Sequence, residues 1–384
     1  MTRTQLEHTV TKHFYDRFNH APQALVLAPG RVNLIGEYTD LNNGFVLPVA
    51  IDRYLAMAVK KRTDEKVVIH SVDFDETVCL DLDRLEKNNH SFQEYISGCL
   101  WALGQKGFSV KGFDAVIAGN IPIGAGLSSS AALELATLRA AAYSGGFTFD
   151  AIKMAGIARF AENRWVGVNC GIMDQLMSAA GIKGHALLID CSTLELNACP
   201  VPDGVSVIIL DTDTRRGLVD SAYNERREQC LRAAEIMRVS SLRQADETLL
   251  AESKNRMDDL IYNRARHVIL ENARVLSTAR AMKRDDAATM GRLMKESHDS
   301  LDHLFEVTSP ALNDIVACSI QQSACLGARM TGAGFAGCAV ALVKKGLEDD
   351  FIRDVTACYG EKTGLTPGIY ICNPSDGVTL KELK

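Results

Sequence analysis

The chain has 384 residues, of which 47% are hydrophobic and 23% charged, a balance that is typical of a folded protein with room for two domains and excludes extensive disorder. Its formal net charge of −6 disfavours nucleic acids and anionic membrane surfaces as partners, so we expect small-molecule ligands. No apolar run approaches the roughly 18 residues of a membrane span, and the cytoplasm is therefore the expected location.

The hydrophobic pattern predicts alternating strands and helices in the first half of the chain. An amphipathic helix is expected over residues 3–19, because Leu6, Val10 and Phe14 recur at helical spacing. Short apolar or alternating runs predict strands at residues 24–28, 55–59, 67–71, 77–80, 113–118, 186–190 and 205–210, and further helices at residues 92–103, 131–142 and 151–162. We expect the first strand to end at Pro29-Gly30, and the strands at residues 55–59, 67–71 and 77–80 to form an antiparallel sheet in an α+β arrangement.

The clearest break in the middle of the chain is Pro200-Val201-Pro202-Asp203-Gly204, which predicts a boundary between a domain of residues 1–200 and a domain of residues 201–384. The second half is richer in helix, with helices predicted near residues 222–236, 261–282 and 287–300 and a strand at residues 338–343. Basic residues on these helices, such as Arg226 and Arg227, are expected on a solvated face.

Cysteines and histidines give little sign of a metal site. Eleven cysteines are scattered without CxxC pairs, and most are expected to be buried thiols, Cys170, Cys191, Cys199, Cys318 and Cys338 among them. Nine histidines lack the HxH and HExxH spacings, so no zinc site is predicted.

The segment before the helix predicted at residues 131–142 has the chemistry of a phosphate-binding loop. Gly124 and Gly126 let the backbone turn tightly, and Ser128, Ser129 and Ser130 follow where the alanine-rich run begins. Free backbone N–H groups and the positive end of the helix dipole would face this loop and attract an anion. The alternative is an ordinary turn in which serines cap a core helix. Three consecutive hydroxyls exceed what capping requires and could also offer an oxygen to a metal ion.

Two other segments place charged side chains next to turns. Arg31, Glu37 and Asp40 fall within ten residues after the first strand, where carboxylates could accept hydrogen bonds from the hydroxyls of a sugar-like ligand. Surface charges at a hairpin are the alternative. Asp174 follows a glycine-containing turn just before the apolar run 176–180, a position in which aspartate is usually a helix N-cap. For both segments, a structural role and a functional role remain as alternatives.

Late in the chain, Gly332-Ala333-Gly334-Phe335-Ala336-Gly337 matches GxGxxG but precedes a predicted strand. A dinucleotide-binding fingerprint follows a strand and opens a helix. We therefore predict a glycine-rich loop that closes over phosphates or the substrate, rather than a Rossmann site.

A family resemblance rests on three motifs in this order: Pro29-Gly30-Arg31-Val32-Asn33-Leu34-Ile35-Gly36-Glu37, Gly124-Ala125-Gly126-Leu127-Ser128-Ser129-Ser130-Ala131 and Met330-Thr331-Gly332-Ala333-Gly334-Phe335-Ala336-Gly337. With these motifs the chain resembles the GHMP family of sugar kinases, and within it the galactokinases. Segments 170–175 and 221–230 add to the resemblance. It implies a two-domain α+β fold, an N-terminal domain with a βαβ arrangement like that of ribosomal protein S5, and an active site in the inter-domain cleft, which the second domain closes.

The resemblance also implies a role for each matching position. Asp174 would be the catalytic carboxylate that faces the anomeric hydroxyl of galactose, and Arg31 would hold it ionised and counter charge on the transferred phosphoryl group. The phosphates of ATP would be bound by Gly124, Ala125, Gly126, Leu127, Ser128, Ser129 and Ser130. Mg²⁺ would be held by Ser130 and Glu162. The sugar would contact Glu37, Tyr38, Asp40, Gly171, Asp174 and Tyr223.

This chain departs from the family pattern at a few positions. Galactokinases usually read Gly-Glu-His-Thr-Asp-Tyr where this chain has Gly36-Glu37-Tyr38-Thr39-Asp40-Leu41, so a phenol replaces a pocket-facing imidazole. Ala333 and Ala336 stand where glycine is commoner, and Phe92 stands where many relatives have tryptophan near the nucleotide base. These departures bear on substrate breadth and rates rather than on the type of reaction.

Two functional hypotheses follow. The first is an ATP-dependent kinase that converts galactose to galactose 1-phosphate and ADP, with another galacto-configured sugar as the alternative substrate. The second is a sensor that binds galactose and ATP without turnover. The intact run 128–132, together with Arg31, Asp174 and the two metal-binding positions, favours the kinase. We expect a monomer, with a weak dimer as the alternative.

Overall fold

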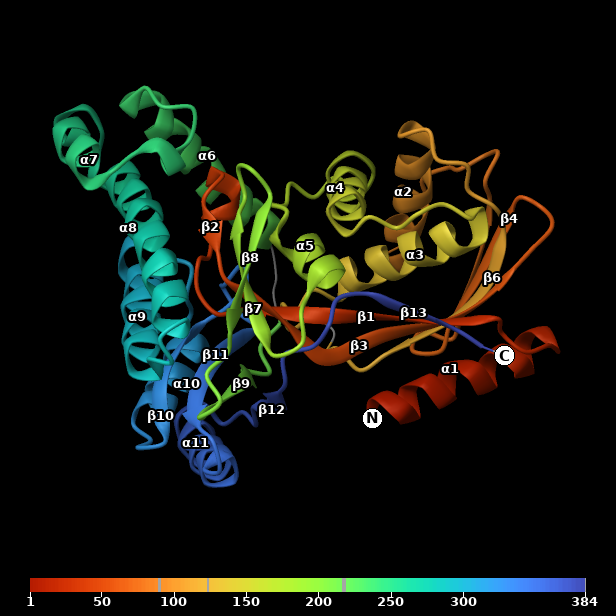
Figure 1. Ribbon diagram of the computed structural model, residues 1–384. Helices are drawn as coiled ribbons and strands as arrows, with labels where there is room; N and C mark the ends of the chain where they lie inside the picture. Colours follow the sequence, from red (N-terminus) through yellow and green to blue (C-terminus); the bar gives the residue numbers. More distant parts are fainter. Residues whose placement is uncertain (89–90, 123, 216–218, 384) are drawn as a thin grey trace.

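The computed structural model describes residues 1–88, 91–122, 124–215 and 219–383. Within these ranges the strands form three sheets, with the orders β13-β1-β3-β6-β4-β5, β10-β11-β9-β12 and β2-β7-β8. Figure 1 shows an elongated molecule in which the first sheet and its helices lie at one end and the long helices α8 and α9 at the other. None of the helices in the described ranges is long and apolar enough to cross a bilayer.

The first sheet is covered on both faces. Its strands are β1 (Ala24–Asn33), β3 (Pro48–Lys61), β4 (Lys66–Ser71), β5 (Glu76–Asp81), β6 (Phe113–Gly119) and β13 (Thr379–Glu382). Side chains alternate between the faces of a strand, so Leu25 and Leu27 of β1 contact α1 (Arg3–Phe18) while Val26 and Ala28 belong to the core on the other side. The predicted N-terminal helix is confirmed, with Leu6, Val10 and Phe14 fully buried.

Four helices lie on the side of the first sheet opposite α1 (Figure 1). They are α2 (Ser91–Gln105), α3 (Ser129–Gly145), α4 (Ala151–Ala161) and α5 (Met173–Ala180). Of these, α3 and α5 are the ones that pack against β1 and β3. Helix α3 packs against β1, β3 and its neighbouring helices, and nearly all its residues from Ala131 to Ala142 are buried. Alanine suits this position because it favours helix and lets the neighbours approach closely. The start of α3 is therefore held rigidly above the sheet.

One expectation for the first sheet was wrong. Strand β1 does not end at Pro29-Gly30 but continues to Asn33, with a shift of register against β3 between Pro29 and Arg31. Such a bulge accommodates a proline, which has no N–H to donate to the ladder. The strands at residues 55–59, 67–71 and 77–80 alternate in direction as expected, and the one parallel pair among the described strands of the sheet, β4 and β6, is joined by a crossover that contains β5 and α2.

The second sheet is antiparallel throughout its described strands, β9 (Val205–Asp211), β10 (Cys325–Met330), β11 (Cys338–Lys344) and β12 (Gly368–Cys372). Contacting helices are α9 (Ala287–Ser300), α10 (Pro310–Ile320) and α11 (Glu348–Thr363), and the layer beyond is built from α6 (Val219–Met237), α7 (Glu247–Ser253) and α8 (Asp259–Met282). Short 3₁₀ or π turns occur at Asp40–Asn42, Glu162–Val166, Leu242–Gln244, Lys254–Arg256 and Leu301–Phe305.

The third sheet consists of β2 (Phe45–Val46), β7 (His185–Asp190) and β8 (Glu195–Pro200), and it contacts α8. Strand β8 was not predicted, because most of its side chains face solvent and it has no clear apolar pattern. The division of the chain at residue 200 stays a prediction. Strand β13, near the C-terminus, returns to pair with β1 in the first sheet.

Two side chains of the second half differ from expectation. Cys318 is not a free thiol, because it forms a disulfide with Cys358 that links α10 to α11. Arg226 is not solvated, because it is buried and donates hydrogen bonds to the carbonyl oxygens of Phe305 and Glu306 at 2.8 and 2.9 Å. Pairing across 40 positions and burial of a helical arginine both depend on how distant elements pack.

Candidate active site

One cavity, of about 460 Å³, collects side chains from segments far apart in the sequence. It lies where the end of β1, the loop before α3 and the start of α5 meet residues of the second half of the chain. The predicted site residues that line it are Arg31, Glu37, Tyr38, Asp40, Gly124, Gly126, Leu127, Ser128, Ser129, Ser130, Glu162, Gly171, Asp174 and Tyr223. Ala125 is the exception, because it is fully buried in the core.

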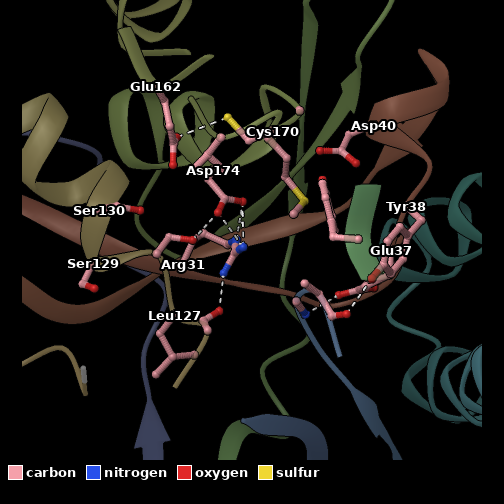
Figure 2. Close-up of a pocket in the computed structure, with 18 of the residues that line it drawn as sticks. Arg31, Glu37, Tyr38, Asp40, Leu127, Ser129, Ser130, Glu162, Cys170 and Asp174 are labelled. Carbon is pink, nitrogen blue, oxygen red and sulfur yellow. Dashed lines mark hydrogen bonds and ion pairs between the residues drawn. The ribbon is translucent and has the colours of Figure 1, made fainter. Parts of the chain in front are cut away.

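An arginine and an aspartate form a bidentate ion pair at the centre of this cavity (Figure 2). Arg31 Nε donates to Asp174 Oδ1 at 2.8 Å, and Arg31 Nη2 donates to Asp174 Oδ2 at 2.7 Å. Arg31 is 5% exposed, whereas the Asp174 side chain is 32% exposed and so stays open to a ligand. Two parallel charge-assisted hydrogen bonds fix the orientation of the carboxylate. Asp174 lies in the first turn of α5, whose N-cap is Ile172, so the N-cap reading of Asp174 is wrong.

The loop before α3 comes very close to β1 behind this pair. The Arg31 N–H donates to the carbonyl oxygen of Leu127 at 3.2 Å, and a Cβ on Gly30 would lie 2.7 Å from the same oxygen. Any side chain at position 30 would therefore push the loop away from the strand. Arg31 Nη1 also donates to the carbonyl oxygen of Gly126 at 2.7 Å. The first motif and the loop are thus locked together by Gly30 and Arg31.

The serines at the start of α3 face the cavity rather than cap the helix. Ser128 has a left-handed backbone, with φ of 61°, and makes no side-chain capping bond. Its hydroxyl instead donates to Asp174 Oδ2 at 2.5 Å. The alternative in which the serines cap this helix is therefore wrong for Ser128, because its hydroxyl is bonded to the carboxylate of Asp174. Ser129 and Ser130 line the cavity beside the positive end of α3, which is suited to an anion.

A buried acidic cluster adjoins the serines. Glu162 lies where α4 passes into a π turn, and its Oε2 accepts hydrogen bonds from Gln175 Nε2 at 2.6 Å and from the Cys170 thiol at 3.2 Å. Burial raises the pKa of Glu162 to about 7, and the negative charge of Asp174 adds to the effect. Gln175 Nε2 also donates to Glu134 Oε2 at 3.2 Å.

Glu134 and Gln175 were missed in the sequence. Burial, and then the charge of Glu162, raise the pKa of the fully buried Glu134 well above its ordinary value. One signal could have found it, because Glu134 follows Ser130 by four positions and so lies one helical turn along the same side of α3.

The carboxylate of Asp40 reaches the cavity because Gly171 has no side chain. A Cβ on Gly171 would collide with that carboxylate. Burial raises the pKa of Asp40 to about 7, and the nearby charge of Asp174 adds to the effect. Two carboxylates therefore share the polar wall of the cavity, one held by Arg31 and one with a raised pKa.

Glu37 and Tyr38 line the same wall, and both bond to the glycine-rich third motif. Glu37 Oε1 accepts from the backbone N–H of Gly332 at 3.0 Å, and the Tyr38 hydroxyl donates to the carbonyl oxygen of Ala333 at 2.6 Å. The Tyr38 ring packs on Tyr223 and Phe305, with ring centroids 5.4 and 4.6 Å apart. Tyr38 is thus part of the wall itself and joins the first motif to the third.

Arg215 is a further residue that sequence reasoning missed. It lines the cavity from the second half of the chain and pairs with Asp211, at 2.8 Å from Nη1 and 3.0 Å from Nη2. A Cβ on Gly124 would lie 3.4 Å from Arg215 Cδ, so the guanidinium stands across from the loop. A lone arginine after a strand gives no local signal, and its placement depends on how the two sheets meet.

A second cavity, of about 790 Å³, adjoins the first at Ser129 and Ser130, which line both. Its walls include Phe74 and Phe92, whose rings stack with centroids 5.4 Å apart, and also Trp165. Such an aromatic space fits a flat ring system. The second cavity thus provides an apolar slot. The first provides a helix end suited to an anion, buried carboxylates suited to a cation, and a polar wall in which the carboxylate of Asp174 has a fixed orientation.

Comparison with family profiles gives three matches along the chain. Residues 12–61 match the galactokinase galactose-binding signature, residues 94–182 the GHMP kinases N terminal domain, and residues 278–361 the GHMP kinases C terminal profile. Arg31, Glu37, Tyr38 and Asp40 fall in the first of these ranges.

Individual relatives cover nearly the whole chain. A galactokinase of Roseiflexus sp. (strain RS-1) is 41% identical over 380 residues, which cover 96% of this chain and 95% of that protein. The crystal structure of Lactococcus lactis galactokinase complexed with galactose is similar with a TM-score of 0.93 and 32% identity, covering 96% of this chain and 98% of that one. Methanococcus jannaschii mevalonate kinase shares the fold, with a TM-score of 0.64 and 19% identity over 92% of this chain and 99% of that one.

Proposed function

Because this chain belongs to the galactokinase family of the GHMP kinases, we propose that the cavity around Arg31 and Asp174 is the place where it phosphorylates galactose. The reaction transfers the γ-phosphoryl group of ATP to the C1 hydroxyl of galactose and gives galactose 1-phosphate and ADP. The observation that carries the proposal is the bidentate Arg31–Asp174 pair beside the start of α3. The pair places the carboxylate that would bind the C1 hydroxyl of galactose next to the helix start that would bind the phosphates of ATP.

In this proposal Asp174 accepts a hydrogen bond from the C1 hydroxyl and orients it for attack on the γ-phosphoryl group. Phosphoryl transfer depends mainly on positioning and on charge stabilisation, so the fixed orientation of the carboxylate matters at least as much as full proton removal. Arg31 keeps that orientation and adds positive charge near the transferred group. Ser128, which donates to Asp174 Oδ2, holds the same carboxylate from the loop side.

The loop 124–130 and the start of α3 would bind the phosphates of ATP, and Arg215 would face them from the second half of the chain. The second cavity continues from Ser129 and Ser130, so it is the place proposed for the base, with Phe74 and Phe92 as its aromatic wall. Phe92 here takes the place of the tryptophan that is common in relatives. An aromatic side chain keeps the stacking surface with a smaller ring.

Ser130 and Glu162 would hold Mg²⁺, whose preferred ligands are oxygens and which needs few of them from protein. The two residues fit this role, since both line the cavity and the side-chain hydrogen bonds of Glu162 to its described neighbours all go to Oε2. Gln175 and Cys170 would then orient the carboxylate from behind. The ion would neutralise phosphate charge when bound.

Replacing Glu162 with glutamine is expected to raise the Mg²⁺ concentration for half-maximal activity by at least about 10-fold, a loss that even outer-shell substitutions cause at metal sites. The reason is the removal of one anionic oxygen ligand. The measurement is activity against Mg²⁺ concentration, with galactose affinity measured in parallel. Glu65→Gln is the matched control, because Glu65 pairs with Lys111 at 2.7 Å and lines neither cavity. An unchanged Mg²⁺ requirement in Glu162→Gln would return Glu162 to a structural role.

Galactose binding is expected to weaken as the pH falls below about 7, the pKa of Asp40. The pKa is raised, so the protonated form predominates below it and can no longer serve as an anionic acceptor for a sugar hydroxyl. Each further pH unit should cost about tenfold in affinity. Calorimetric titration with galactose, without ATP, from pH 5.5 to 8.5 measures this. Asp40→Asn should bind weakly with no such dependence, and a wild-type affinity that is constant over the range would contradict the assignment.

The proposed function is tested by release of ADP from ATP in the presence of single sugars. We expect activity with galactose. The same assay with other galacto-configured sugars measures the range of sugars that the protein accepts with Tyr38 in the wall. Binding of galactose and ATP without ADP release would instead indicate the sensor. We further propose a cytoplasmic monomer, with a weak dimer as the alternative, because the reaction consumes ATP and uses a single-chain cavity.

A further inference from the structure

Arg329, near the end of β10, is a fully buried cation outside both cavities. Its guanidinium forms an ion pair with Glu37 and donates from Nη1 to the carbonyl oxygens of Asn33 and Leu34, each at 3.4 Å. Three of its partners therefore belong to the first motif, residues 29–37. Arg329 itself directly precedes the third motif, residues 330–337. A buried charge is costly unless it is paired and hydrogen-bonded, and this one is satisfied by the first motif together with Ser297 and Glu271.

The carboxylate of Glu37 is held from the second half of the chain on both oxygens. Oε1 accepts from the Gly332 N–H at 3.0 Å, while Oε2 pairs with Arg329. The Thr331 hydroxyl shares its single proton between Glu37 Oε1 at 3.2 Å and the carbonyl oxygen of Asn33 at 3.0 Å, both in the first motif. Glu37 is 2% exposed. Its direction is consequently set by Arg329 and the third motif rather than by its own strand end.

Helices α8 and α9 support the same arrangement. Arg329 Nε donates to the Ser297 hydroxyl at 3.2 Å, and Ser297 donates in turn to Glu271 Oε1 at 2.5 Å. Glu271 Oε1 also accepts from the backbone N–H of Gly36, next to Glu37, at 3.0 Å. One buried network, formed by Arg329, Ser297 and Glu271, therefore holds the first motif at two consecutive residues, Gly36 and Glu37.

We propose that Arg329 is a positioning residue for galactose phosphorylation, which acts through Glu37 by holding the first motif against the third along the sugar-facing wall. The inference rests on the proposed function, because it assumes that this wall receives the sugar. Without Arg329, Glu37 would be a buried carboxylate deprived of its cation. Burial already raises its pKa against the opposing effect of Arg329, so the protonated form would be favoured and the bonds to Thr331 and Gly332 would weaken.

The effect should be confined to the sugar. The network reaches Tyr38, which is bonded to Ala333, and the wall that leads to Asp40. The phosphate loop is bonded to a different residue of the first motif, Arg31, which contacts Gly126 and Leu127 and, within the described part of the chain, has no hydrogen bond to Arg329, Ser297 or Glu271. Loss of Arg329 should therefore change the KM for galactose and leave the KM for ATP nearly unchanged.

A double-mutant cycle tests the proposal. We expect Glu37→Gln and Arg329→Met each to lower kcat/KM for galactose by about 10- to 200-fold, mainly through KM, while KM for ATP changes by less than about twofold. Because Arg329 acts through Glu37, the double variant should lose no more than the more damaged single variant. Losses that multiply in the double variant would overturn the proposal, as would equal changes in KM for both substrates.

Removal of one member of a buried ion pair can prevent folding, so thermal unfolding is measured for every variant. Thr331→Val, which removes one donor to Glu37 and leaves both charges in place, provides a second test with the same galactose-specific direction and a smaller loss. No galactose-specific loss in folded Thr331→Val would overturn the proposal if Arg329→Met does not fold. Arg329→Lys keeps the charge and should fall between wild type and Arg329→Met.

Arg62→Met is the matched control, because Arg62 pairs with the buried Asp114 at 2.7 Å and neither residue lines a cavity. It should lower stability without changing KM for galactose. The wild-type assay separates the two levels of inference. A wild-type protein that does not phosphorylate galactose would refute the proposed function, whereas an active wild type with independent effects of Glu37 and Arg329 would refute the positioning role alone.

Discussion

Asp174→Asn is expected to lower kcat by about 100- to 10,000-fold, the range that a positioned acid–base group contributes. The amide keeps the shape of the carboxylate but cannot accept the proton, and it carries no charge to complete the bidentate pair with Arg31. Galactose should still bind, because Asp40, Tyr223 and the wall around them are unchanged. ADP release measures the first effect, and calorimetric titration with galactose measures the second.

The matched control for this variant is Asp64→Asn. Asp64 forms a bidentate pair with Arg62 at 2.6 and 2.7 Å, the same geometry as at Asp174, and it lies outside both cavities. Its replacement should leave kcat at the wild-type value. If Asp174→Asn retained activity within a few-fold of wild type, Asp174 would have no part in the chemistry, and a joint loss of turnover and galactose binding would indicate a collapsed site.

Arg31→Lys is expected to lower kcat by about 100- to 1,000-fold, the loss typical for removal of one preorganised group at a transition state. An ammonium is a point charge and cannot reproduce the planar fork that holds both oxygens of Asp174. It would also lose the bond from Nη1 to Gly126, which ties the phosphate loop to β1. Steady-state kinetics with both substrates should show a fall in kcat and a moderate rise in KM for ATP.

Lysine keeps the positive charge, so this substitution separates geometry from charge at position 31. Arg62→Lys, in the equivalent pair with Asp64, should have normal kinetics. Wild-type kcat in Arg31→Lys, with the protein folded, would show that the bidentate geometry is not needed for turnover. If Arg31→Lys does not fold, the contribution of the Arg31–Asp174 pair to turnover is judged from the larger effect of Asp174→Asn.

Much of the local structure could be predicted from the sequence because its causes are local. The spacing of Leu6, Val10 and Phe14 specifies one buried helix face, and α1 has the predicted start and ends within one residue of the prediction. The alanine-rich run after Ser130 and the strand 113–118 are likewise helix and strand as expected. The motifs that carry the family resemblance are contiguous as well, and the membership of the galactokinase family that they indicated is confirmed.

Several features that sequence reasoning missed depend on partners elsewhere in the chain. Strand β8 has few buried side chains and exists because it pairs with β7. The parallel pairing of β4 with β6 depends on the crossover through α2, and no residue pattern in either strand indicates it. The disulfide between Cys318 and Cys358 joins helices whose approach is set by the second sheet.

By itself the sequence indicated which residue types the site contains, since Arg31, Ser130 and Asp174 belong to short recognisable segments. Only the tertiary structure decided what each side chain bonds to. The Ser128 hydroxyl reaches Asp174, 46 positions away, instead of capping α3, and Glu37 is bonded to Gly332, 295 positions away. Hydrogen bonds and ion pairs act only over a few ångströms, and which distant residues come that close is set by sheet register and helix packing, which no local pattern encodes.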